Sequence, residues 1–141
     1  MNTRITKRTD FDQAINELCL KKGAEIGVHK GGFSEHILAN SNIEKMYSID
    51  AWMEDQNTTK AVRKHCDRGK MEGCYQETLS KLSKFGNRSV VIRDLSENAV
   101  KQFEKESLDF IYLDASHLFS GFAIDLIKKK KKLRWGGLFA G

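Results

Sequence analysis

A strand that runs into a glycine-containing turn and then into a helix most constrains how this chain folds. An apolar run over residues 24–28 contains Gly27, Gly31 follows in the turn, and a helical pattern begins at Phe33. Such a turn lets backbone N–H groups and the positive end of the helix face a bound ligand. Glycine is favoured where the backbone turns sharply or comes close to that ligand. The run therefore predicts a binding site at the end of the first strand.

The spacing of this motif narrows the kind of ligand. It reads Glu25-x-Gly27-x-x-x-Gly31, which differs from the Gly-x-Gly-x-x-Gly of a dinucleotide site. An acidic first position with two glycines suits a nucleoside that carries a charged amino-acid group better than it suits a pyrophosphate.

A second apolar segment adds to this prediction. Residues 45–50 read as a strand that ends in Asp50. In nucleoside-binding α/β folds, an acid at the end of the second strand accepts hydrogen bonds from the ribose hydroxyls. Asp50 is therefore a candidate ribose ligand; the alternative is an Asp that only ends the strand.

Four segments in this order resemble the class I S-adenosylmethionine-dependent methyltransferases, in particular their small-molecule O-methyltransferase-like branch. The resemblance covers nearly the whole chain from about residue 24 onward. The segments that carry it are residues 24–28, 48–52, 109–117 and 136–141.

The resemblance implies an α/β fold, a Rossmann-like, doubly wound and mostly parallel sheet flanked by helices. A single S-adenosylmethionine-binding domain is expected over residues 1–141, with an N-terminal helix in 1–22 and the sheet in 23–141. The alternation of strand and helix patterns agrees with this fold. Further strands are expected at 89–93, 108–114 and 137–141, and helices from Thr9 toward Gly23, over 33–39, around 75–82, from Ser96 through Phe103 and over 125–132.

Relatives of this kind continue beyond the position that corresponds to Gly141 with an acidic pair and two more strands. The resemblance therefore implies a sheet truncated after its fifth strand, without much of the acceptor pocket. A fifth strand with a free edge invites self-association, so we expect a homodimer through that edge or an aggregation-prone monomer.

The resemblance also implies which residues hold the cofactor. Glu25, Gly27 and Gly31 are expected to shape the pocket for its methionine part. Asp50 is expected to hold its ribose.

Three further residues are expected near the adenine. Trp52 flanks the ring in this hypothesis, although ordinary packing explains an aromatic residue there equally well. Asp94 and Ser96 border the ring after the third strand. Ser96 is also well placed to cap the helix that follows.

The residues that end the fourth strand are the candidates for catalysis. Methyl transfer to oxygen needs an acceptor that is deprotonated or polarised and held in line with the donor. His117 is the candidate general base. Asp114 is expected to hold the amino group of the donor or to coordinate Mg²⁺, which prefers carboxylate oxygens. Alternatively, both residues cap the strand and the next helix.

Charge and composition exclude several other classes of protein. The net charge of +5 comes largely from five lysines at 128–132, which we interpret as the solvated end of a helix rather than a nucleic-acid site. No apolar run approaches the roughly 20 residues that cross a membrane. Three cysteines without a dense framework fit a reducing cytoplasm.

The sequence thus predicts a cytoplasmic methyltransferase that transfers a methyl group from S-adenosylmethionine to a small-molecule hydroxyl. The main alternative is a non-catalytic module of the same fold that binds the cofactor or a partner. A nicotinamide-dependent dehydrogenase half-domain is a further alternative, but its glycine pattern is missing from this sequence. An RNA-binding methyltransferase is suggested only by the positive net charge.

Overall fold

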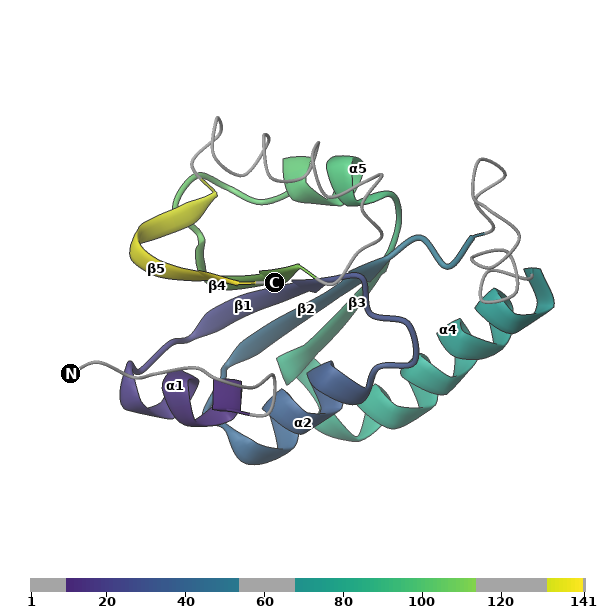
Figure 1. Cartoon of the computed structure of the whole chain (residues 1–141), viewed down its shortest axis with the longest axis horizontal. Helices are drawn as coiled ribbons and strands as arrows, with labels where there is room; N and C mark the ends of the chain where they lie inside the picture. Colours follow the sequence, from purple (N-terminus) through teal and green to yellow (C-terminus); the bar gives the residue numbers. More distant parts are fainter. Residues whose placement is uncertain (1–9, 54–67, 114–131, 141) are drawn as a thin grey trace.

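The computed structural model describes residues 10–53, 68–113 and 132–140. Its centre is a five-stranded sheet in the order β3-β2-β1-β4-β5 (Figure 1). Every neighbouring pair of strands is parallel, which confirms the predicted doubly wound sheet. The strands are β1 (Lys22–Ile26), β2 (Lys45–Asp50), β3 (Ser89–Arg93), β4 (Leu108–Leu113) and β5 (Leu133–Ala140).

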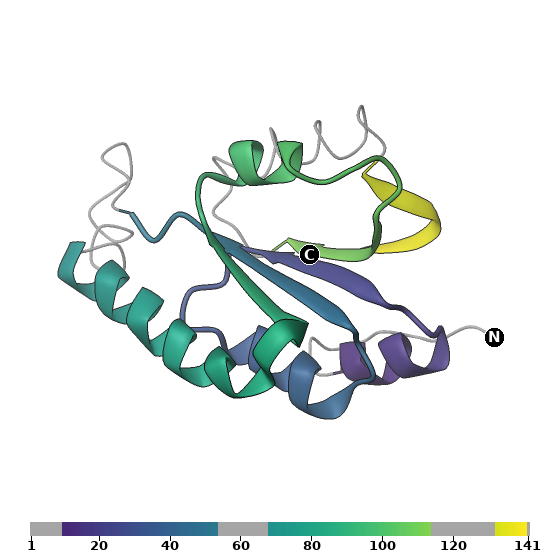
Figure 2. The same ribbon diagram turned by 180° about the vertical axis from the view of Figure 1, so that it is seen from behind.

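Helices cover both faces of this sheet. Three helices lie on one face and α5 (Ser96–Lys101) lies on the other, as Figures 1 and 2 show from opposite sides. The helices on the first face are α1 (Phe11–Glu17), α2 (Gly32–Asn40) and α4 (Arg68–Leu82), and a 3-10 segment, η2 (Ser83–Arg88), leads from α4 into β3. None of the helices in the described part of the chain is long and apolar enough to span a membrane.

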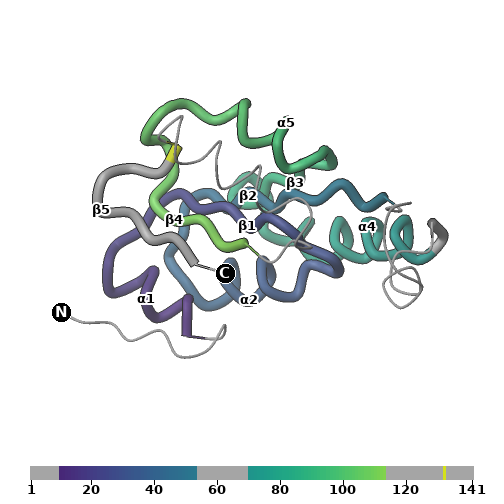
Figure 3. Tube along the Cα trace, turned by 45° about the horizontal axis from the view of Figure 1, so that its top comes forward, coloured from purple at the N-terminus to yellow at the C-terminus, as the bar shows by residue number. Residues whose placement is uncertain are grey.

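The central strands are buried on both faces, as expected for parallel strands between two helical layers. Figure 3 shows β4, β1, β2 and β3 side by side in this order. On β4, Ile111 packs in the core beneath α5, whereas Phe110 packs in the core beneath α1 and α2. Successive side chains of a strand point to opposite faces, so one strand contributes to both cores.

Helix α1 is fixed to the sheet by aromatic contacts. The ring of Phe11 lies 5.8 Å from that of Phe33 at the start of α2 and 5.3 Å from that of Tyr112 on β4, between ring centroids. Phe33 and Tyr112 stack at 4.3 Å. These contacts pack the first helix on the sheet.

Helix α1 ends earlier than its apolar pattern predicts. Cys19 adopts a left-handed backbone with φ 53°, and the N–H of Leu20 donates to the carbonyl of Ile15 at 3.0 Å. This is the hydrogen bond of a Schellman motif, which ends a helix. Leu18 and Cys19 are therefore exposed rather than part of the apolar face.

The first strand starts and ends two residues earlier than expected. At its start, the N–H groups of Lys21 and Lys22 donate to Asp109 Oδ2 at 2.6 and 2.9 Å. At its end, Gly27 turns away with φ 94°. Conversely, α4 begins at Arg68, seven residues before the helix expected around 75–82, and includes Gly69 and Gly73.

Strand β5 begins at Leu133, four residues before the predicted start of the fifth strand. The prediction of a solvated helix end is wrong at Lys132, which lies outside the described helices and is only 9% exposed. Its ammonium group donates to the carbonyl of Phe103, and its own carbonyl accepts from the N–H of Leu108 at 3.1 Å. Pairing with β4 thus decides the conformation at this end of the lysine run.

Replacing Gly23 by Ala is expected to destabilise the protein by about 1–3 kcal/mol, because the new methyl group overpacks the core. A Cβ at this position would lie 1.8 Å from Cε1 of Phe110. Gly73→Ala is the matched control: its Cβ would meet nothing within 4 Å, and Ala in a helix adds about 0.5–1 kcal/mol of stability. Urea unfolding measures both changes, and equal stabilities of G23A and the wild type would contradict this packing.

Candidate functional site

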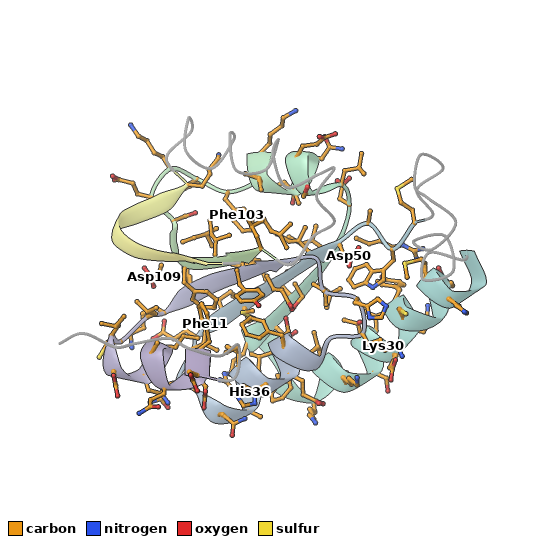
Figure 4. All side chains as sticks on the ribbon, in the orientation of Figure 1. Phe11, Lys30, His36, Asp50, Phe103 and Asp109 are labelled. Carbon is orange, nitrogen blue, oxygen red and sulfur yellow. The ribbon has the colours of Figure 1, made fainter. Side chains whose placement is uncertain are left out.

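The site predicted from the sequence lies where the sheet changes direction. Strand β1 pairs with β2 on one side and with β4 on the other. The sheet therefore extends from β1 in one direction through β2 and β3 and in the other through β4 and β5. In sheets of this kind, ligands bind beyond the carboxyl ends of the strands at this point. Asp50 lies at that end of the sheet, and Asp109 lies toward the opposite end (Figure 4).

The segment after β1, residues 27–31, is here named the glycine loop. Gly27 and Gly31 adopt φ 94° and 86°, which side chains rarely allow. A Cβ on Gly31 would also lie 3.1 Å from Cγ2 of Thr78 on α4. Both glycines are therefore required by the fold of the loop, as the motif predicts.

The glycine loop leads into an α2 whose amino end has no side-chain cap. The first intrahelical bond runs from the N–H of Glu35 to the carbonyl of Gly31 at 2.9 Å. The N–H groups of residues 32–34 therefore precede the hydrogen-bonded ladder of the helix. A Cβ on Gly32 would meet nothing within 4 Å. This combination of N–H groups and space suits an anionic group.

Glu25 is buried beneath this helix end and reaches it through a hydroxyl group. It is 0% exposed, as are Ser34 and Ser48. Ser34 Oγ donates to Glu25 Oε1 at 2.8 Å and lies 2.7 Å from Ser48 Oγ. Since Ser34 has one hydroxyl proton, Ser48 donates to Ser34. Glu25 thus links β1 to α2 and β2, and we interpret it as a positioning residue for the amino end of α2.

Asp50 connects the glycine loop to the segment after β2. Its Oδ2 accepts the N–H groups of Val28 and His29, both at 2.9 Å. Its Oδ1 accepts the N–H of Trp52 at 3.0 Å. An ionised carboxylate has about four acceptor positions, so these contacts leave about one of them, on Oδ1, for a ligand.

Two residues bonded to Asp50 have strained backbones. His29 and Trp52 adopt φ 59° and 45°, and such values are uncommon without glycine. The indole of Trp52 donates to the carbonyl of His29 at 2.7 Å and packs with Tyr75. Only 2% of Trp52 is exposed, so its packing role is clear, and its contact with adenine stays a prediction.

Asp94 and Ser96 follow β3, next to the end of β2. The N–H of Asp94 donates to the carbonyl of Asp50 at 3.1 Å. Asp94 Oδ1 accepts the N–H of Leu95 at 2.7 Å and the side-chain amide of Asn98 at 3.2 Å. The N-cap of α5 is Leu95 and not Ser96. The predicted capping role of Ser96 is therefore wrong, because α5 starts one residue too early for it.

Helix α4 supports the glycine loop from outside. Thr78 Oγ1 lies 3.1 Å from the carbonyl of His29 and 2.8 Å from that of Cys74, and its one proton is shared between them. Lys81 Nζ donates to the carbonyl of Lys30 at 3.2 Å. Cys74 Sγ lies 3.8 Å from Nε2 of His29. Burial raises the pKa of the Cys74 thiol, so this thiol is protonated at neutral pH and forms only a weak contact.

A charged pair closes the edge of the site next to α4. Arg93 at the end of β3 donates to Glu72 Oε2 at 2.6 Å, and its guanidinium lies 4.3 Å from the centroid of the Tyr75 ring. The hydrogen bond from Arg93 lowers the pKa of the Glu72 carboxyl. The pair therefore joins α4 to β3 beside Trp52.

The predicted catalytic residues Asp114 and His117 lie outside the described residues. The same holds for the Mg²⁺ site assigned to Asp114. Within residues 10–53, 68–113 and 132–140, no group of three or more His, Cys, Asp or Glu side chains is arranged to hold a metal ion.

Comparison with known families now decides the class of protein. The family described as a methyltransferase domain matches residues 24–141, which is most of the chain and includes the glycine loop and Asp50. The chain belongs to the methyltransferase domain family. The resemblance to class I S-adenosylmethionine-dependent methyltransferases that the sequence predicts is therefore confirmed.

Solved structures share the fold of this methyltransferase domain. An S-adenosylhomocysteine-bound methyltransferase from Podospora anserina is 16% identical with a TM-score of 0.70, over 99% of this chain and 52% of its own. A putative caffeoyl-CoA O-methyltransferase from Staphylococcus aureus is 16% identical with a TM-score of 0.69, over 99% of this chain and 57% of its own. Spermidine synthase from Thermotoga maritima is 16% identical with a TM-score of 0.58, over 94% of this chain and 42% of its own. This methyltransferase domain thus spans about half the length of these structures, and among curated proteins none matches its sequence significantly.

Sequence reasoning missed four residues that shape the site. Ser34 and Ser48 carry no motif, and only the pairing of β1 with β2 brings Ser48 opposite Glu25. Thr78 lies far along the chain from the loop that it supports. His29 falls inside the glycine motif, and its position between Gly27 and Gly31 was a signal that could have drawn attention to it.

Asp50→Asn is expected to destabilise the ligand-free methyltransferase domain by about 1–3 kcal/mol, because the amide NH₂ would face at least one backbone N–H. Because the amide keeps one acceptor oxygen, amide hydrogen exchange is expected to speed up at the N–H groups that face the new NH₂ group: at Val28 and His29 if it replaces Oδ2, or at Trp52 if it replaces Oδ1.

Asp109→Asn is the control for this experiment. Asp109 also accepts two backbone N–H groups, but at the opposite end of the sheet. The D109N substitution is expected to reduce the stability of the fold and to leave amide hydrogen exchange near the glycine loop unchanged. Unchanged exchange at Val28, His29 and Trp52 alike in D50N would show that Asp50 does not hold the loop.

Proposed function

We propose that this methyltransferase domain binds S-adenosylmethionine and transfers its methyl group to a hydroxyl of a small molecule. The observation that carries the proposal is the arrangement around Asp50. One carboxylate fixes the glycine loop after β1 and keeps an acceptor position at the end of β2, where a ribose is bound in folds of this kind.

The described residues fit the three parts of this cofactor. The uncapped amino end of α2 beside Gly31 and Gly32 would hold the amino-acid carboxylate. Oδ1 of Asp50 would accept a ribose hydroxyl. Asp94 uses Oδ1 for bonds within its own turn, so Oδ2 would accept the amino group of the adenine. The adenine side is therefore assigned to Asp94, with Ser96 beside it.

The cofactor, when bound, supplies a methyl group on a positively charged sulfur, which is an activated leaving group. The protein then has to orient the acceptor oxygen in line with that methyl group and take up its proton. We assign the proton to His117, and the amino group of the donor or an Mg²⁺ ion to Asp114, as the sequence suggests. These two roles are part of the proposal. So are the small-molecule hydroxyl acceptor and a homodimer through the edge of β5.

A module that binds the cofactor or a partner without turnover is the second candidate. Cofactor binding without methyl transfer to any of a panel of hydroxyl acceptors would select this candidate.

The first test is calorimetric titration of the 141-residue chain with S-adenosylmethionine and S-adenosylhomocysteine. We expect saturable binding of both, and none of NADH, because the glycine spacing does not suit a pyrophosphate. Asp50→Ala is expected to weaken binding by about 1.5–3 kcal/mol, the value of a hydrogen bond to a charged group. If the folded chain binds neither adenosyl ligand, the proposed function is refuted.

A further inference from the structure

His29 lies in the glycine loop in a conformation that glycine adopts more easily. Its φ is 59°, within the left-handed region that side chains other than those of Asn, Asp and His rarely enter. Gly27 and Gly31, on either side, have positive φ values and carry no side chain. Strained residues that persist are typically over-determined by their surroundings and concentrate at ligand sites.

The backbone of His29 is held without help from its side chain. Its N–H donates to Asp50 Oδ2 at 2.9 Å. Its carbonyl accepts from Trp52 Nε1 at 2.7 Å and from Thr78 Oγ1 at 3.1 Å. A glycine at this position would keep all three hydrogen bonds and lose the strain. The fold of the loop therefore does not explain the imidazole.

The imidazole has capacity to bind something else. His29 is exposed, and the hydrogen-bonding contact of its ring seen among the described residues is the weak one from Nε2 to Cys74 Sγ at 3.8 Å. In either tautomer a neutral imidazole has one N–H donor and one acceptor nitrogen, and the contact with Cys74 involves only Nε2.

The surroundings of this donor favour an anion. The glycine loop ends at the uncapped amino end of α2, which carries partial positive charge. Lys30 is the next residue, and the ammonium group of Lys81 lies 3.2 Å from its carbonyl oxygen and 3.6 Å from Glu77 Oε1. Among the parts of an adenosyl cofactor, only the amino-acid end carries an anionic group.

We propose that His29 is a ligand-contacting residue whose imidazole binds the amino-acid carboxylate of the adenosyl ligand, together with the amino end of α2. The strained backbone presents the ring, and Asp50, Trp52 and Thr78 hold that backbone in place. This inference rests on the proposed function and assigns the carboxylate contact to a specific side chain.

The test compares two ligands that differ in the amino-acid group. S-Adenosylhomocysteine has it, and 5′-methylthioadenosine lacks it. In His29→Gly, calorimetry is expected to show an affinity for S-adenosylhomocysteine reduced at least about tenfold and an unchanged affinity for 5′-methylthioadenosine. The melting temperature is expected to stay equal or to rise, because glycine relieves the strained conformation.

Glu106→Gly is the matched control. Glu106 is exposed, has φ 58° and precedes β4 at the end of the sheet away from the site. This variant relieves a similar strain and is expected to leave both affinities unchanged.

Two results would overturn the assignment while leaving the proposed function intact: equal affinity of wild type and His29→Gly for S-adenosylhomocysteine, or an equal loss for both ligands. If the wild type binds neither ligand, the cofactor proposal fails and this assignment fails with it.

Discussion

The carboxylate of Asp50 is the interaction on which the rest of the site depends. It ends β2 and accepts three backbone N–H groups, two from the glycine loop and one from the segment after β2. Hydrogen bonds to a charged acceptor are stronger than those between neutral groups. They hold His29 and Trp52 in left-handed conformations that would otherwise relax. In the proposed function, the same residue would shape the loop before a ligand arrives and keep an oxygen for that ligand.

The layers around the sheet make this arrangement rigid. From within the core, Glu25 bonds to Ser34 and thereby fixes the start of α2 over β1. From outside, α4 supports the loop through Thr78. The glycine loop is consequently held from the sheet, from α2 and from α4, which is how a methyltransferase domain of this size can keep a preorganised binding site. Preorganisation reduces the conformational cost of binding.

Patterns with a strong local cause were predicted well from the sequence. Strands β2 and β3 have the predicted bounds, because each is a short run enriched in β-branched or apolar residues between polar turns. The predictions failed where long-range pairing competes with local pattern. Leu133 fits a helical stripe but pairs with Leu108 as part of β5. Leu18 continues the apolar stripe of α1, but the Schellman turn at Cys19 exposes it.

The sequence by itself determined the family, the order of strands and helices, and the candidate role of Asp50, because glycine spacing and apolar runs are local properties of the chain. Only the tertiary structure decided how these residues act. It turned Glu25 into a buried link to α2, packed Trp52 under the loop and left the imidazole of His29 exposed. These outcomes depend on which strands become neighbours and on which helix packs over the loop, and contacts between residues far apart in the chain leave no periodic trace in the sequence.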